Sequence, residues 1–357
     1  MRREDKKEGK GIQEARDRFS SFKIWNHIDK IVGIVNDEIT YPVTIEIDPT
    51  NVCNFKCIFC LDQKKVDKTS INVDVLLNLI AQLKECNVKS IVIKGGGEPL
   101  LYPQLDVLLY ALSDAKIVSG MITNGSMLDQ HIEAIGRNLN WLRVSLDAFS
   151  EYTHQIVHGN NTVDINRIFD NMEILCNNYP DLMVGANFVV NNHNYREILP
   201  LIIKLEKLGV KSINIRPPFL FEGEIKEEVW KELDMIIGKS DTIGGNIVVV
   251  SQYKYRDRDT YYTNKEWDKC RATPLIGSIG ADGNVYVCCA LKGFKEFSFG
   301  NLNEESFINI WHGERRKEVM NMIGNETCQK YCSDRLDTYN RLLSYLANKE
   351  SRKNLFL

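Results

Sequence analysis

The chain has 357 residues, of which 43% are hydrophobic and 26% charged, with a formal net charge of −3. This length suits one large domain or two ordinary ones, and the slightly acidic balance excludes a broad basic surface for nucleic acid. The first ~20 residues are charged and lack the apolar core of a signal peptide, and no apolar run reaches the ~18 residues of a membrane span. We therefore expect a cytoplasmic protein without nucleic-acid or membrane partners.

Ten cysteines in a reducing compartment indicate metal binding or redox chemistry rather than disulfides. Three of them, Cys53, Cys57 and Cys60, stand close together directly after a run with strand character. Zinc and iron–sulfur clusters are the usual occupants of such thiolate sites. A structural zinc ion needs a fourth ligand, and no histidine lies nearby. A four-iron cluster held by three thiolates would keep one iron open for a ligand from outside the protein.

Predicted strands and helices alternate from residue 43 onward. The strands cover residues 43–48, 89–94, 117–122, 141–146, 182–190 and 212–216. The helices between them cover residues 72–86, 103–114, 128–137, 164–178 and 195–208. Strands separated by single helices imply an α/β fold with a parallel sheet and right-handed crossovers. In a barrel of such units the chemistry gathers at the carboxyl ends of the strands.

Polar groups stand at or near the ends of successive predicted strands. The turn after the second strand reads Lys-Gly-Gly-Gly-Glu-Pro; its glycines permit close approach to a ligand and Glu98 could accept from an ammonium group, with a plain turn as the alternative. Asn124 follows the third strand in a Thr-Asn-Gly turn. Ser145 and Asp147 stand at the end of the fourth, where helix capping is the other use of such residues. Asn187 lies in the fifth strand, where it could equally bond an adjacent backbone.

The spacing of Cys53, Cys57 and Cys60 resembles the signature of the radical S-adenosylmethionine enzymes, and four strand ends carry polar groups in that family's order. The resemblance spans roughly residues 40–220 and implies a partial (β/α)6 barrel with parallel strands. It also implies a [4Fe–4S] cluster whose open iron is chelated by the amino and carboxylate groups of S-adenosylmethionine. The cofactor-binding residues implied by the family motifs are Gly96, Gly97, Glu98, Asn124, Ser145, Asp147 and Asn187.

Two basic residues share this face of the predicted sheet. Arg216 ends the sixth strand and could orient a polar substrate or the cofactor, with a surface ion pair as the alternative. His158 follows the Asp147 segment, where many relatives carry an arginine, and it is equally consistent with a satisfied core or surface histidine.

A second cysteine set lies in the last quarter of the chain. An Asp-Gly-Asn turn predicts a hairpin over residues 276–289 that could deliver Cys288 next to Cys270. The four candidate ligands are Cys270, Cys288, Cys328 and Cys332. Such a closed set suits zinc or a protein-held [4Fe–4S] cluster. Cys289 is left over, as a core thiol or a hydrogen-atom donor.

This region resembles the SPASM and twitch extensions of the same enzymes, through the Gly283-to-Cys288 spacing, the segment 299–302 and Ile310-Trp311. Five cysteines fit the shortened twitch type with one auxiliary [4Fe–4S] cluster better than a full SPASM set. Apolar residues at helical spacing also predict an N-terminal packing helix, namely Phe22, Trp25, Ile28, Ile31 and Val32. The expected units are an N-terminal extension (1–39), the barrel (40–220), a connector (221–269) and a hairpin-and-helix cluster domain (270–357).

The resemblance implies an enzyme in which a 5′-deoxyadenosyl radical abstracts hydrogen from an unactivated carbon. Only about 40 residues precede the first strand, too few for a separate recognition domain, which favours oxidation or epimerisation of a small sugar or aminocyclitol. The alternatives are peptide or protein modification and, in another class, a non-catalytic zinc- or cluster-binding module. Arg216 and Cys289 are candidates for a direct part in catalysis, and a flavodoxin or ferredoxin is the expected electron donor.

Overall fold

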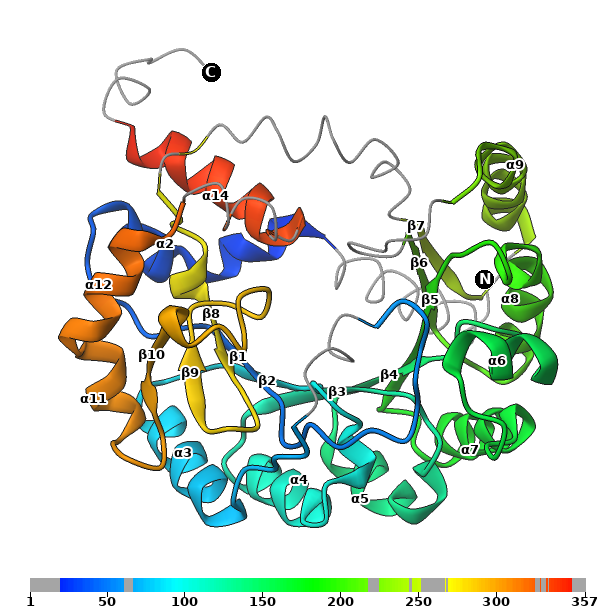
Figure 1. Cartoon of the computed structure of the whole chain (residues 1–357), viewed down its shortest axis with the longest axis horizontal. Helices are drawn as coiled ribbons and strands as arrows, with labels where there is room; N and C mark the ends of the chain where they lie inside the picture. The colour runs from blue at the N-terminus through cyan, green and yellow to red at the C-terminus, as the bar shows by residue number, and fades with distance from the viewer. Residues whose placement is uncertain are drawn as a thin grey trace, which may run out of the picture.

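The protein folds as one curved, open sheet with helices around its outside (Figure 1). This computed structural model describes residues 20–60, 67–217, 225–243, 246–251, 267, 269–324, 328, 332 and 334–348. Residues 221–224, 244–245, 252–266 and 268 of the expected connector lie outside these ranges. No helix of the described part is long and apolar enough to cross a membrane.

Ten strands form the sheet in the order β10-β9-β8-β1-β2-β3-β4-β5-β6-β7. The barrel strands are β1 (Thr44–Ile47), β2 (Ser90–Ile93), β3 (Val118–Thr123), β4 (Trp141–Ser145), β5 (Met183–Val189), β6 (Ser212–Arg216) and β7 (Val248–Ser251). All of their pairings are parallel. The remaining strands are β8 (Ile276–Ile279), β9 (Asn284–Tyr286) and β10 (Ser298–Asn301). β8 pairs in parallel with β1 and in antiparallel with β9, so the C-terminal hairpin continues the barrel sheet.

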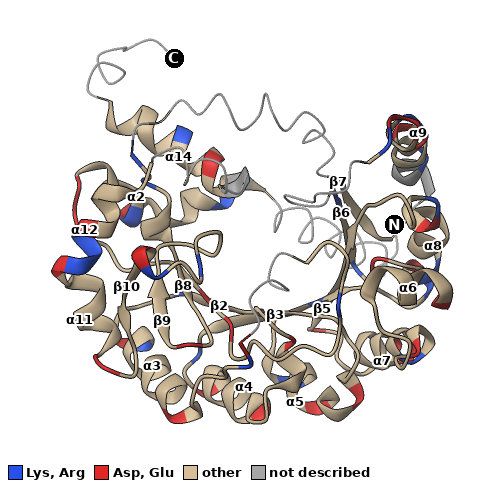
Figure 2. Ribbon diagram, viewed as in Figure 1, with Lys and Arg blue, Asp and Glu red and all other residues tan. Residues whose placement is uncertain are grey.

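Helices surround these strands (Figure 1). They are α3 (Val73–Glu85), α4 (Leu105–Asp114), α5 (Ile132–Asn138), α6 (Glu151–His158), α7 (Ile165–Asn178), α8 (Ile198–Lys207), α9 (Glu227–Ile243), α11 (Phe307–His312), α12 (Glu314–Met322) and α14 (Asp334–Ala347). Short 3-10 turns are η3 (Pro99–Leu101), η4 (Leu128–Gln130), η5 (Tyr195–Glu197), η7 (Thr273–Leu275) and η8 (Lys295–Phe297). Some helices start at a side-chain cap; Asn72 caps α3 and Asp164 caps α7. Acidic and basic residues are spread over this outer layer (Figure 2).

Along β1, successive side chains point alternately toward the outer helices and into the barrel. Ile45 and Ile47 are fully buried, and Ile45 and Trp311 of α11 both border Gly277, so this side of the strand faces the outer helices. Glu46 then points into the barrel, because successive side chains of a strand point to opposite faces.

The α/β barrel with parallel strands and the C-terminal hairpin are confirmed. The structure adds β7 to the sheet from residues 246–251, which the sequence placed in the connector, and joins β8 to β1. The division of the chain into four units stays a prediction.

The N-terminal helix exists, but its predicted packing face is wrong. It consists of η1 (Ser21–His27) and α2 (Ile28–Val35), and its buried residues are Ile24, Ile31 and Ile34. The other expected contacts are exposed, namely Phe22, Trp25, Ile28 and Val32. Apolar residues occur around most of this helix, so periodicity alone could not select the buried side.

Candidate active site

The three-cysteine loop leaves the carboxyl end of β1 and is held by α6. Lys56 N–H donates to the carbonyl of His158 (2.8 Å) and Ile58 N–H to that of Val157 (3.0 Å). Both acceptors lie in the last turn of α6, where backbone carbonyls have no partner within the helix. Gly159 ends the helix with φ of 58°, and a Cβ there would meet the Lys56 carbonyl at 2.7 Å. A glycine is therefore needed for the loop to lie this close.

The glycine–glutamate turn after β2 lies against the start of the same loop. Gly97 N–H donates to the Thr50 carbonyl (3.0 Å), and Glu98 N–H donates to the Val52 carbonyl (2.8 Å). A Cβ on Gly97 would lie 2.2 Å from the Val52 oxygen, and one on Gly96 would lie 2.3 Å from Oδ1 of Asn51. The glycines thus allow two backbone segments to touch just before Cys53.

The Glu98 carboxylate is buried and fully engaged. Oε1 accepts from the Leu100 N–H (2.9 Å) and the Thr123 hydroxyl (2.5 Å), and Oε2 accepts from the Asn124 N–H (2.7 Å). Burial raises its pKa to about 7, although these hydrogen bonds oppose the shift. Glu98 therefore braces the end of β3, and the family's contact with the cofactor amino group stays a prediction.

Asn124 brings the third strand end to the cysteine loop. Its Nδ2 donates to Oδ1 of Asn54 (2.9 Å), and Asn54 Nδ2 donates to the Ser126 hydroxyl (2.9 Å). Asn54 follows Cys53 directly. The third strand end therefore helps to set the path of the metal-binding loop, a role of Asn54 that the sequence did not suggest.

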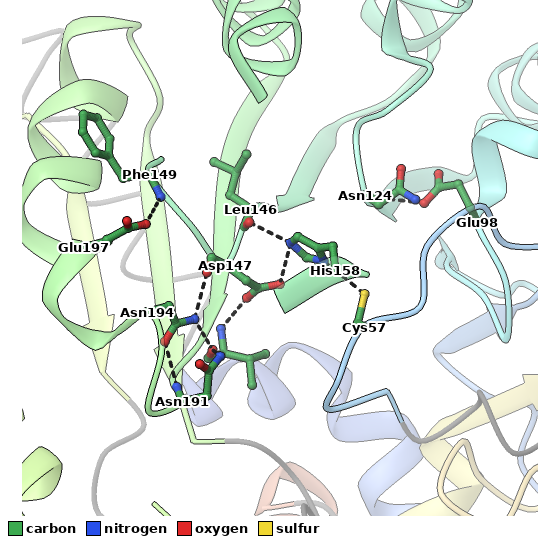
Figure 3. Close-up of polar contacts among 11 residues, drawn as sticks. Cys57, Glu98, Asn124, Leu146, Asp147, Phe149, His158, Asn191, Asn194 and Glu197 are labelled. Carbon is green, nitrogen blue, oxygen red and sulfur yellow. Dashed lines mark hydrogen bonds and ion pairs between the residues drawn. The ribbon is translucent and has the colours of Figure 1, made fainter. Parts of the chain in front are cut away.

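Asp147 and His158 lie behind Cys57 (Figure 3). His158 Nε2 donates to the Leu146 carbonyl (2.8 Å), and its Nδ1 lies 3.0 Å from Cys57 Sγ. Asp147 has φ of 53°, accepts from the Val189 N–H, and receives a hydrogen bond on its carbonyl from Asn194. Aspartate tolerates this left-handed conformation better than most residues. Burial raises the pKa of Asp147 to about 7 and lowers that of His158 to about 3.

The sequence left the role of His158 open, and the structure places it between the Leu146 carbonyl and Cys57. The sequence could not predict that His158 is buried, because its contact with Cys57 joins residues that are 101 positions apart in the chain. Ser145, by contrast, is half-buried at the end of β4.

The last two strand ends supply Asn187 and Arg216. Asn187 is buried and accepts from Nδ2 of Asn214 on the neighbouring strand (3.4 Å). Arg216 is exposed, and its charge acts to lower the pKa of Asp147, against the larger effect of burial. Their contacts with cofactor or substrate stay predictions.

The three cysteine thiols are suited to a metal centre. Cys53 and Cys60 are exposed and Cys57 is half-buried. Burial and the neighbouring cysteines raise the pKa of Cys53 to about 11 and that of Cys57 further. Such thiols stay protonated until a cation is present, and soft thiolates select iron–sulfur clusters among other metals. The donor set therefore fits a cluster that is open to solvent on one side.

In the second cysteine set, Cys288 lies close to Cys270 and Cys328. Burial raises the pKa of Cys288 well above its usual range, and Cys289, Cys270 and Cys328 add to the shift because they lie close by. Cys270, Cys288, Cys328 and Cys332 are all buried, whereas Cys289 is half-buried. Asn340 of α14 positions this site, because its Nδ2 donates to Cys270 Sγ (3.4 Å) and its Oδ1 accepts from two N–H groups that follow Cys270.

A parallel barrel with a three-cysteine loop at its strand ends and a second set of buried cysteines is typical of an iron–sulfur enzyme. The model of the Radical SAM superfamily matches residues 47–236, and that of SPASM, an iron–sulfur cluster-binding domain, matches residues 270–334. The first match covers more than half of the chain. The chain belongs to the radical SAM superfamily.

Relatives cover most of the chain. GTP 3',8-cyclase of Staphylococcus saprophyticus is 32% identical over 79% of this chain and 91% of that protein. PqqA peptide cyclase of Gluconobacter oxydans is 20% identical over 76% of each chain. The structure of Streptococcus suis SuiB bound to precursor peptide SuiA has a TM-score of 0.66 at 18% identity, covering 86% of this chain and 75% of that one.

These matches confirm the cofactors expected from the sequence. The enzyme uses a [4Fe–4S] cluster that binds S-adenosylmethionine and an auxiliary cluster in the SPASM domain. A non-catalytic zinc module is thereby set aside. Which cysteine holds which iron stays a prediction from the sequence and from the assembly described above.

Proposed function

We propose that the protein oxidises a peptide or protein substrate at an unactivated carbon. The observation that carries this is the match to PqqA peptide cyclase, which extends over 76% of both chains and therefore spans the barrel and the cluster domain. The fold shared with peptide-bound SuiB supports it. Both favour a peptide over the sugar or aminocyclitol expected from the sequence.

The bound cofactors would supply the radical chemistry, namely a 5′-deoxyadenosyl radical that takes a hydrogen atom and an auxiliary cluster that accepts an electron. The chain's own residues hold that chemistry in place. Glu98 and Asn124 brace the strand end against the cysteine loop, and His158 supports Cys57 from behind. Arg216, exposed at the end of β6, is the described cation best placed to meet a polar group of the substrate.

Nucleotide cyclisation is the second candidate, because GTP 3',8-cyclase is the relative with 32% identity. A triphosphate is bound by several cations whose charge is not already neutralised by carboxylates of the protein. Two lysines beside the barrel interior are already engaged: Lys94 pairs with Glu46 at 2.6 Å, and Lys292 pairs with Asp48. This favours the peptide.

The test is an anaerobic assay of the reconstituted, dithionite-reduced protein with S-adenosylmethionine. One arm contains a library of synthetic peptides, a second contains GTP, and a third contains glucosamine. We expect 5′-deoxyadenosine to form only in the peptide arm, together with a peptide that has lost two hydrogen atoms. Turnover with GTP instead would assign the second candidate. Turnover with glucosamine alone would restore the sugar substrate.

A further inference from the structure

A hollow of about 170 Å³ lies on the outside of the cluster domain, away from the strand-end site. It is bounded by the chain just after α2, by the segment that contains Cys270 and by α12. α2 and α12 lie next to each other in Figure 1. The charged residues of its wall are Asp37, Glu38, Lys269, Arg271, Arg316 and Lys317. Four cations thus face two carboxylates.

Arg316 is the unusual member of this wall. The residue is only 6% exposed, and its guanidinium lies 4.5 Å from the ring centre of Trp311 and 5.7 Å from that of Phe299. Its Nε is buried without a hydrogen-bond acceptor, and the described part of the chain offers it no carboxylate. The two rings stabilise the cation from its faces, but they provide no acceptor for Nε. Burial accordingly lowers the pKa of Arg316 to about 10.

A buried charge without a partner is strongly disfavoured, and native proteins satisfy nearly all of their buried polar groups. The two lysines of the wall are each paired with a carboxylate: Lys269 Nζ lies 2.8 Å from Asp37, and Lys317 Nζ lies 2.5 Å from Glu314. Arg316 is therefore a buried cation of this wall that has no carboxylate partner among the described residues. An anion that enters would find a guanidinium already held in place by packing.

We propose that this hollow is a binding site for an oxyanion, a carboxylate or phosphate group that Arg316 grips at its inner end. The planar guanidinium fork matches either group. A hollow of 170 Å³ is smaller than the ~300 Å³ at which drug-sized ligand pockets begin, so it takes one group and not a whole nucleotide. Cys270 lies in the same wall, so an occupant would lie beside the second cysteine set.

The test is calorimetric titration of the full-length, anaerobically reconstituted protein at constant low ionic strength, with inorganic phosphate and separately with glutarate. We expect saturable binding of at least one of them by the unmodified protein, and at least tenfold weaker binding by Arg316→Gln. Arg315→Gln is the matched control, because Arg315 is the neighbouring arginine but is half-exposed and pairs with Glu318. The absence of saturable binding, or equal binding by Arg316→Gln, would overturn the proposal.

If Arg316→Gln does not fold, a variant at the protein surface provides a second test. Lys317 is half-exposed, so Lys317→Glu places a negative charge at the mouth of the hollow without disturbing buried packing. We expect it to weaken anion binding several-fold, whereas Lys295→Glu, at an exposed site outside the hollow, leaves binding unchanged. Unchanged binding by Lys317→Glu would count against the site.

A last measurement separates the proposal from its rival, in which Arg316 only balances the charge of the auxiliary cluster. In that case Arg316→Gln shifts the auxiliary reduction potential while the unmodified protein binds no anion, and the proposal is overturned. An additional arm compares an aspartate-rich hexapeptide with its asparagine counterpart. Tighter binding of the acidic peptide than of phosphate would identify a polypeptide carboxylate as the source of the anion, and the reverse order a free phosphate; either supports the site.

Discussion

Lys292 donates a hydrogen bond to Asp48 across 244 positions of the chain, and both side chains are buried. Asp48 is the residue directly after β1, where the cysteine loop begins, and Lys292 follows the hairpin of the cluster domain. The ion pair therefore ties the two cysteine regions together at the base of the site. Among the described residues the second carboxylate oxygen of Asp48 has no hydrogen-bond partner, so the lysine is the main compensation for this buried charge.

Lys292→Met should destabilise the protein by ~3–5 kcal/mol, because it leaves the Asp48 carboxylate buried and unpaired. The measurement is the free energy of unfolding in urea. Arg137→Met, which breaks the exposed Arg137–Glu133 pair, should change it by less than ~1 kcal/mol. A double variant that also carries Asp48→Leu should recover much of the loss. Equal effects of the two single variants would show that the buried pair is no more important than a surface one.

Cys57→Ala should remove the cluster that binds S-adenosylmethionine and leave the auxiliary one. Iron after reconstitution should fall from about eight to about four atoms per chain, and formation of 5′-deoxyadenosine should cease. Cys176→Ala is the control, since Cys176 lies in α7, away from both cysteine sets. Cleavage of S-adenosylmethionine by the Cys57 variant would remove this loop from the mechanism.

Gly97→Ala should displace the start of the cysteine loop, because its methyl group would lie 2.2 Å from the Val52 oxygen. We expect iron incorporation and S-adenosylmethionine binding to fall together, the latter measured by equilibrium dialysis. Gly238→Ala is the control, at a glycine with room for a methyl group. Nothing lies within 4 Å of a Cβ at Gly238 in α9, so alanine there should stabilise the helix by ~0.5–1 kcal/mol without affecting either readout. Normal iron and cofactor binding by the Gly97 variant would mean that the loop adapts.

Glu98→Gln should flatten the dependence of stability on pH. The Glu98 pKa is about 7 in the folded protein against 4.5 when unperturbed, so folding favours the protonated acid. This stabilisation is fully present below pH 4.5 and is lost as the pH rises through 7, a change of about 3 kcal/mol. Asp147, whose pKa is also raised to about 7, contributes with the same sign, so the slope decreases without vanishing.

The thermal midpoint of unfolding across this pH range provides the measurement. Glu133→Gln, at an exposed carboxylate, should leave the slope unchanged. A Glu98 variant with the slope of the unmodified protein would place the titration elsewhere.

Much of the barrel could be predicted because each strand and helix has its own local pattern. Helix α6 was missed, because the residues that it buries include Thr153, His154 and His158, which hide its amphipathic character. The strand-end motifs located Glu98 and Asn124, but their contacts depend on how the loops fold back. The unpartnered Arg316 and the Lys292–Asp48 pair arise from chain segments far apart in sequence, and no local pattern encodes such pairings.

The parallel pairing of β8 with β1 gives the two cysteine regions a shared support. β1 leads directly into Cys53 at one end, and β8 begins shortly after Cys270, with Thr44 opposite Ile276 in the register. A slip of one residue along this pairing would move one cysteine set by ~3.3 Å relative to the other. The separation of the two cysteine regions is therefore set by the backbone hydrogen bonds between β1 and β8.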